Sequence, residues 1–178
     1  MISAVIPTFN DAERLTATLS ALAPAAIDGF VREVIVADGG SIDGTVAVAE
    51  DAGAEVFMRR LGEACAKARQ PWLLILSAGS RPQVGWEQAA RTHMRDHPDK
   101  AGWFDLALAA PGAGARLQEA AAKFENVVFG RLRAPQGLLV KRELLRELGT
   151  AQEYAEIVSW LGRLRLRALG VRALSDSH

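Results

Sequence analysis

Residues 33–45 read Glu33-Val34-Ile35-Val36-Ala37-Asp38-Gly39-Gly40-Ser41-Ile42-Asp43-Gly44-Thr45. The run 34–36 is apolar and β-branched without polar alternation, which is typical of a strand buried on both faces of a sheet. The glycines after Asp38 permit a tight turn and the close approach of another molecule to the backbone. A helical pattern with a good capping residue, Asp43, follows the turn. This stretch therefore predicts a buried strand, a turn and a helix in direct succession.

The same alternation extends to both sides of this stretch. Further short strands are predicted at residues 2–6, 54–57 and 72–76, and helical patterns fill the intervals between them. We expect Asn10 or Asp11 to cap the first helix and Pro24 to end it. Buried strands that alternate with helices predict an α/β fold with a doubly wound, mostly parallel sheet and helices on both faces.

The second half of the chain is less regular. We expect helices over residues 83–97, 116–129, 141–148 and 152–163, and strands over 102–108 and 137–140. Residues 164–174 alternate Leu or Val with Arg and fit no single element. Because no repeat or linker divides the sequence, residues 1–178 are expected to form a single domain.

Composition excludes several classes of protein. The 21 basic and 21 acidic residues give no net charge, which argues against a protein that coats nucleic acid. The single cysteine, Cys65, allows neither an intrachain disulfide nor a multi-cysteine metal site, so we expect a reducing compartment, the cytoplasm. No apolar run is long enough to cross a bilayer and no secretion signal is expected, although contact with a membrane surface stays open.

Three polar segments follow the predicted strands, at residues 7–10, 38–41 and 77–80. In an open parallel sheet, ligands bind beyond the carboxyl ends of the strands. A carboxylate at Asp38 would accept hydrogen bonds from the base or sugar of a nucleoside and would repel phosphate. The alternative is that residues 38–45 form only a turn and a helix cap.

The order of these segments resembles a known family. Residues 2–10, followed by residues 33–45, are similar to the opening of family 2 glycosyltransferases, and residues 136–144 and 153–169 resemble its later segments more weakly. The resemblance implies the GT-A fold and transfer of a sugar from a nucleotide diphosphate donor, most simply a uridine nucleotide. It also implies that residues 1–100 bind the nucleotide and that residues 101–178 form the acceptor side.

The resemblance further assigns roles to single residues. Those implied to hold the nucleoside are Pro7, Thr8, Asn10 and Asp38, with Gly40 and Ser41 shaping the floor of the site. Arg59 and Arg60 would reach the uracil or the diphosphate. The alternative for these adjacent arginines is a solvated face.

The sequence departs from the family after the fourth predicted strand. The family carries an Asp-x-Asp motif there, whose carboxylates hold a divalent cation against the diphosphate. The segment that replaces it contains Ser77, Gly79, Ser80 and Arg81 and no carboxylate. We therefore do not expect an ordinary Mg²⁺ or Mn²⁺ site, and the diphosphate would depend on Arg59, Arg60, Arg81 or backbone N–H groups.

The acceptor side also departs from the family. Tyr154 stands where the family has the aspartate that acts as general base, and a phenol with a reference pKa of about 10 is a poor base. Glu153 and Glu156 are the candidate replacements. Gln136, Tyr154 and Trp86 are expected on the acceptor side, Trp86 either stacking on a sugar or buried in the core.

Two functions remain open at this stage. The first is a glycosyltransferase-like enzyme that uses a nucleotide-sugar, with metal-independent transfer as one form. The second is a catalytically degenerate relative that binds a nucleotide or a partner protein through the inherited cleft.

Overall fold

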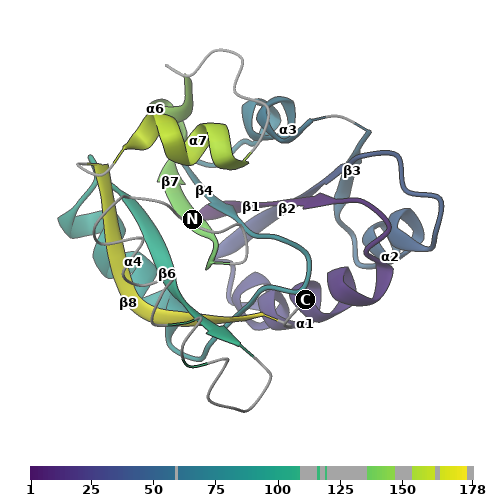
Figure 1. Cartoon of the computed structure of the whole chain (residues 1–178), viewed down its shortest axis with the longest axis horizontal. Coiled ribbons are helices and arrows are strands. Elements are labelled where there is room, and N and C mark those ends of the chain that lie inside the picture. The colour runs from purple at the N-terminus through teal and green to yellow at the C-terminus, as the bar shows by residue number, and fades with distance from the viewer. Residues whose placement is uncertain are drawn as a thin grey trace.

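The computed structural model describes residues 1–58, 60–108, 116, 119, 136–146, 154–162 and 165–175 (Figure 1). The strands are β1 (Ile2–Thr8), β2 (Val31–Asp38), β3 (Glu55–Phe57), β4 (Trp72–Ile75), β5 (Arg81–Pro82), β6 (Ala101–Leu108), β7 (Leu138–Lys141) and β8 (Leu166–Ser175). The helices are α1 (Ala12–Ile27), α2 (Thr45–Asp51), α3 (Leu61–Lys67), α4 (Trp86–Asp96), α6 (Arg142–Arg146) and α7 (Tyr154–Leu161).

The strands form one eight-stranded sheet in the order β3-β2-β1-β4-β7-β6-β8-β5. The pairs β1–β2, β1–β4, β2–β3 and β6–β8 are parallel. β7 runs antiparallel to both β4 and β6, and β5 runs antiparallel to β8. The predicted single-domain α/β fold with a mostly parallel sheet is confirmed, and the antiparallel pairs of β7 and β5 make the sheet mixed.

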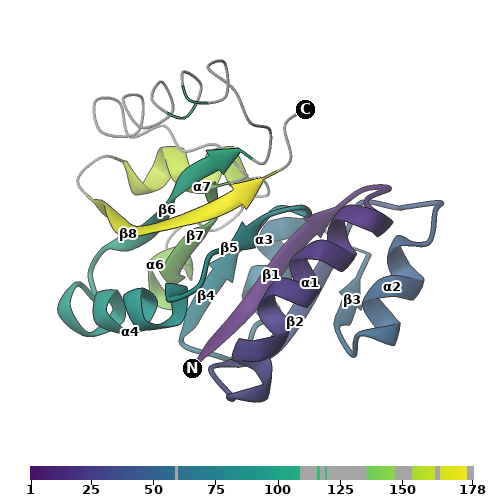
Figure 2. The ribbon, with the colours of Figure 1, turned by 90° about the horizontal axis from the view of Figure 1, so that it is seen from below.

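Helices cover both faces of this sheet, α1, α2 and α4 on one side and α3, α6 and α7 on the other (Figures 1 and 2). The alternation of side chains along β1 explains how one strand serves two cores. Ile2, Ala4 and Ile6 pack with α1 and α4, whereas Val5 packs with α3 and α7. All these positions must be apolar, which is why the strand lacks polar alternation.

The first half follows the predicted order, and the main differences concern Pro24 and the later strands. Pro24 lies inside α1 and does not end it, because its carbonyl still accepts a hydrogen bond from Asp28 at 3.0 Å and only one bond, that of its missing N–H, is lost. β5 has no sequence signal, and the ambiguous stretch at 164–174 contains most of β8. The helix predicted at 116–129 lies mostly outside the described residues.

A buried carboxylate joins the amino-terminal ends of β1 and β2. Glu33 is 8% exposed and accepts hydrogen bonds from the Ser3 hydroxyl, from the Arg69 backbone N–H at 2.9 Å and from Arg69 Nε at 2.6 Å. Burial raises the pKa of Glu33, but the bonds from Ser3 and Arg69 outweigh this effect and hold the pKa below its ordinary value.

Glu33→Gln is therefore expected to lower the free energy of unfolding by about 2 kcal/mol at neutral pH, because the amide presents an N–H₂ group to donors. A group with a lowered folded pKa stabilises the protein above its unfolded pKa and loses this effect as the pH falls. The difference between the variant and the wild type should thus shrink below about pH 4. Urea unfolding at several pH values measures it. Glu55, 3.8 Å from Arg69 and 52% exposed in its side chain, provides the control, since Glu55→Gln should change little.

Among the described residues, none of the helices combines the length and the apolar character that a bilayer span requires.

Candidate functional site

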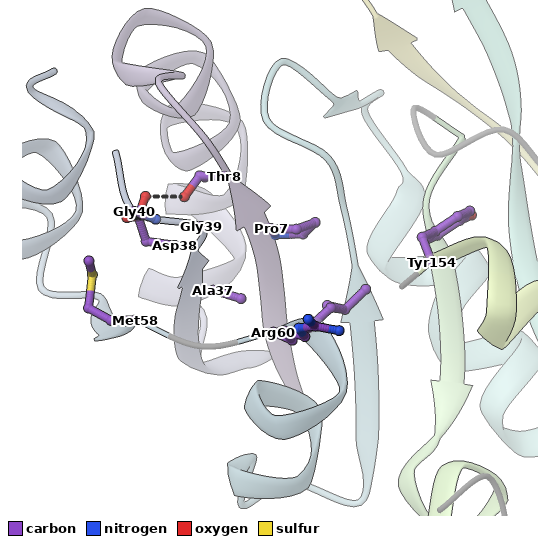
Figure 3. A pocket seen from close by; sticks show the side chains of 10 residues that line it. Pro7, Thr8, Ala37, Asp38, Gly39, Gly40, Met58, Arg60 and Tyr154 are labelled. Atoms are coloured by element: carbon purple, nitrogen blue, oxygen red, sulfur yellow. Dashed lines mark hydrogen bonds between the residues drawn. The ribbon is translucent and has the colours of Figure 1, made fainter. Parts of the chain in front are cut away.

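A cavity of about 650 Å³ lies at the carboxyl ends of β1, β2 and β3 (Figure 3). Its lining residues are Pro7, Thr8, Ala37, Asp38, Gly39, Gly40, Met58, Arg60, Leu61 and Tyr154. Loops that are far apart in the sequence meet here because the parallel strands before them end at one edge of the sheet. The cavity is large enough for a cofactor-sized ligand.

The structure brings together six of the residues named from the sequence. Pro7, Thr8, Asp38, Gly40, Arg60 and Tyr154 line the cavity. Sequence reasoning missed Ala37, Gly39, Met58 and Leu61. Met58 is 60% exposed directly after β3, and a large apolar residue at a strand end was the available signal.

Asp38 braces the loop that follows β2. Its carboxylate, 1% exposed, accepts four hydrogen bonds: from Thr8 Oγ1 at 3.1 Å, from the Gly40 N–H at 2.9 Å, and from both the N–H and the hydroxyl of Ser41. Burial raises the pKa of Asp38, but these bonds outweigh it and hold the pKa below its ordinary value. A carboxylate that accepts so many hydrogen bonds stays ionised and fixes the backbone around it.

Asn10 and Ser41 tie this loop to the one after β1. Asn10 has φ 54°, a left-handed conformation that asparagine tolerates better than most residues. Its backbone N–H donates to Ser41 Oγ at 2.8 Å, and its side-chain oxygen accepts from the Ile42 N–H at 2.9 Å. Neither residue lines the cavity, so both act here as supports of its rim.

Arg60 supplies positive charge to the cavity. It is exposed, immediately precedes α3, and is the basic residue among the described lining residues. In Figure 3 it lies between Ala37 and Tyr154. Its neighbour Arg59 lies outside the described residues.

The segment in place of the Asp-x-Asp motif packs against α1. The Gly79 N–H donates to Arg14 O at 3.0 Å and to Thr18 Oγ1 at 2.9 Å, Ser80 is fully buried, and Arg81 belongs to β5. None of these residues, nor Ser77, is among those that line the cavity.

This donor set does not fit a divalent cation, which prefers several charged oxygen ligands. Ser77 offers one neutral hydroxyl, and the described part of the chain contains no group of three His, Cys, Asp or Glu side chains able to hold a metal ion.

Tyr154 begins α7 and forms the wall of the cavity opposite Asp38. Its ring points away from Pro7 and Arg60 (Figure 3). Its hydroxyl is buried without a hydrogen-bond partner among the described residues, and burial raises its pKa, which disfavours a role as base. Glu156 is exposed on α7, and Glu153 lies outside the described residues.

A carboxylate that the sequence analysis missed lies on the same face of the sheet as Tyr154. Trp103 pairs with Leu138, whose side chain packs with α7, and Asp105 is two residues further along β6 on that face. β6 runs parallel to β1, so Asp105 lies toward the cavity's edge of the sheet. Its Oδ1 atom is buried and lacks a hydrogen-bond partner among the described residues. A single acidic residue in an apolar strand was the signal that could have identified it.

Trp86 and Gln136 do not line the cavity. Trp86 is 2% exposed, with its ring centroid 5.6 Å from that of Phe30 and 6.4 Å from that of Phe104. The stacking of Trp86 on an acceptor sugar is therefore wrong, and its core alternative is correct. Gln136 is fully buried and donates through Nε2 to Phe104 O at 3.2 Å, which holds it against β6.

Comparison with known proteins agrees with this fold. The chain matches the family model for glycosyl transferase family 2 over residues 3–77. It is similar to solved structures of glucosyl-3-phosphoglycerate synthase from Mycobacterium tuberculosis. The structure with Mn²⁺, UDP-glucose and phosphoglyceric acid has a TM-score of 0.69 at 23% identity, and the one with Mg²⁺ and UDP a TM-score of 0.68 at 23% identity. Each alignment covers 100% of this chain and 72% of the other.

A search of curated proteins finds no match to the sequence. The chain therefore has the GT-A-like glycosyltransferase fold, and its residues 3–77 match glycosyl transferase family 2, in agreement with the resemblance noted from the sequence.

Proposed function

We propose that the chain binds a nucleoside diphosphate sugar, of uridine type, in the cavity beyond β1, β2 and β3 and transfers the sugar to an acceptor. The observation that carries the proposal is the convergence of Thr8, Asp38 and Arg60 on one cavity. The similar synthase has been solved with UDP-glucose, which supports a donor of this class. The reduced, buried Cys65 suits the cytoplasm as its location.

The nucleoside end would face the loop that Asp38 braces. All four acceptor directions of the Asp38 carboxylate are occupied. A base or ribose donor would therefore have to replace the Ser41 hydroxyl, whose O–H can turn away from Asp38 while its oxygen still accepts from the Asn10 N–H. The diphosphate would then lie toward Arg60, whose guanidinium can donate to two of its oxygens.

The acceptor would approach from the side of Tyr154, and we propose Asp105 as the carboxylate that takes its proton. A base needs an ionisable group with unused acceptor capacity within reach of the acceptor hydroxyl. Among the described residues, Asp105 has an oxygen with unused acceptor capacity toward that edge of the sheet and on the Tyr154 face, and the acceptor would have to reach it there. Glu156 points from the exposed side of α7, and Glu153 remains a prediction.

Calorimetric titration with UDP, with and without Mn²⁺, tests the proposal. We expect binding, and we expect Arg60→Ala to weaken it by about tenfold, because one charge-assisted hydrogen bond contributes on the order of 1.4 kcal/mol. Arg95, which pairs with Asp96 on α4, is the control, and Arg95→Ala should bind UDP normally. Lack of UDP binding by the wild type would contradict the nucleotide function.

The titration in the presence of Mn²⁺ distinguishes a metal-dependent site from a metal-independent one. Stronger binding with Mn²⁺ would mean that carboxylates other than those of an Asp-x-Asp motif complete a metal site. Binding without any hydrolysis of UDP-glucose would favour the degenerate, nucleotide-binding alternative.

A further inference from the structure

A second hollow, of about 570 Å³, lies between α4 and β8. Its helical wall includes Gln88, Thr92 and Asp96, whose spacing of four residues places them on one face of α4. Its other wall comprises the consecutive residues 167–171 of β8. β8 is irregular here, since its register with β6 shifts between Ala168 and Arg172 and Gly170 has φ 74°, and the hollow follows this irregular part of the strand. α4 covers the face of the sheet opposite to α3 and α7, so this groove is separate from the nucleotide cavity.

The edge of β8 in this groove is unpaired among the described residues. β8 pairs with β6 over most of its length, but β5 covers only Ala173 and Leu174, and Gln83 adds one bond to Arg172 O at 2.9 Å. Those backbone N–H and C=O groups of residues 166–171 that point away from β6 therefore lie on the side of the groove. A strand edge beside a helix is the geometry in which an extended peptide adds to a sheet.

The two ends of the groove differ in character. Gln83 bonds to Arg172 just before α4 starts, and the turn after His97 leads into β6 at Ala101, which pairs with Leu166. α4 therefore runs opposite to β8. Leu169 and Val171 contribute apolar surface toward the start of α4, whereas Arg167 and His97 lie toward its end.

The charge at the second end is positive. The side chain of Asp96, the acidic residue of that wall, is held by Arg95 through bonds of 2.7 and 3.0 Å, so its charge is already compensated. Burial lowers the pKa of His93 beside it, and the charges of His97 and Arg167 add to this effect, whereas the hydrogen bond with the Lys100 carbonyl and the charge of Asp99 oppose it. Arg167 itself is exposed. A carboxylate fits this end, and a second copy of β8 would instead bring its own arginines to it.

We propose that the groove between α4 and β8 binds an extended peptide segment as an added strand antiparallel to β8, with apolar side chains beside Leu169 and Val171 and a carboxylate at its C-terminal end beside Arg167. Antiparallel addition directs the C-terminus of the peptide toward Arg167. The bond pattern of antiparallel pairs also makes this the more stable arrangement.

Fluorescence anisotropy with a labelled synthetic peptide, Ser-Val-Thr-Val-Glu with a free C-terminus, tests the proposal. We expect saturable binding with a dissociation constant below about 1 mM, as for weak peptide recognition. The same peptide methylated at alternate backbone nitrogens keeps its side chains but loses N–H donors, and it should not bind. Protection of the amides of residues 166–171 from hydrogen exchange should accompany binding of the unmodified peptide.

Arg167→Glu is expected to weaken binding by about tenfold, the equivalent of one charge-assisted bond. Arg172→Glu is the matched control, because Arg172 is exposed on the same strand and does not line the groove. No binding by the wild type, equal binding of the methylated peptide, or equal effects of the two substitutions would each overturn the proposal. A concentration-dependent dimer that Arg167→Glu disrupts would also overturn it, since the occupant would then be a second copy.

Discussion

Asp38→Ala is expected to lower the free energy of unfolding by about 3 kcal/mol and to weaken UDP binding at least a hundredfold. The substitution removes the acceptor of four hydrogen bonds and leaves the N–H groups of Gly40 and Ser41 without a partner. Each buried donor left unsatisfied costs on the order of 1–3 kcal/mol, part of which water recovers at this partly open rim. Urea unfolding and calorimetric titration measure the two effects.

The loss of binding should exceed what one missing contact explains. The carboxylate holds the loop after β2, and that loop in turn supports the loop after β1 through Ser41 and Asn10. Without this brace, binding must also order both loops, which reduces affinity. Asp51→Ala at the exposed end of α2 is the control and should change neither quantity.

The pH dependence gives a second test of the Asp38 assignment. The folded pKa of Asp38 lies below its ordinary value, so its stabilising contribution is complete above the unfolded pKa. The contribution is lost as the pH falls through the folded pKa. The stability difference between the wild type and Asp38→Ala should therefore be constant near neutrality and shrink in acid. A difference that grows in acid would contradict the assignment.

Local signals were sufficient for the first half of the chain. Strands buried on both faces leave continuous apolar runs, so β1, β2 and β4 could be recognised without knowledge of their partners. Their shared direction then placed Thr8 and Asp38 at one edge of the sheet. Arg60 was assigned to the same site through the family resemblance.

Positions set by long-range packing could not be predicted in this way. Trp86 follows a polar loop and looked available to a ligand, yet Phe30 and Phe104, distant in sequence, enclose it. β5 has only two residues, and both are part of a strand through their pairing with β8, which is distant in the sequence. The internal bonding of Asp38 likewise depends on a turn geometry that the composition of the loop does not specify.

The same limit explains why Asp105 was missed. A charged residue within a predicted strand is most simply placed on a solvated face. The face of the sheet on which Asp105 lies follows only from the three-dimensional structure. Trp103, two residues earlier on the same face, pairs with Leu138, and Leu138 packs with α7. The family motif drew attention to residues 153–156 instead, where Tyr154 replaces the expected acid.

Asp105→Asn is expected to lower the turnover of UDP-glucose hydrolysis or transfer by a factor of about 10²–10⁴, the range for loss of a general base. UDP affinity should stay unchanged, because Asp105 does not line the nucleotide cavity. Stability should be unchanged or slightly higher, since the Oδ1 atom is buried without a partner among the described residues and the amide carries no charge. Steady-state kinetics, UDP titration and urea unfolding separate these effects.

Three matched variants decide which carboxylate acts. Asp105→Glu should recover part of the turnover and Glu156→Gln should retain all of it, because Glu156 lies on the exposed side of α7. Loss of turnover in Glu156→Gln or Glu153→Gln, with Asp105→Asn fully active, would transfer the role to α7 or to the residue before it. If Asp105→Asn is more stable and less active at once, the buried oxygen is maintained at the expense of stability, which is the pattern expected of a group kept for catalysis.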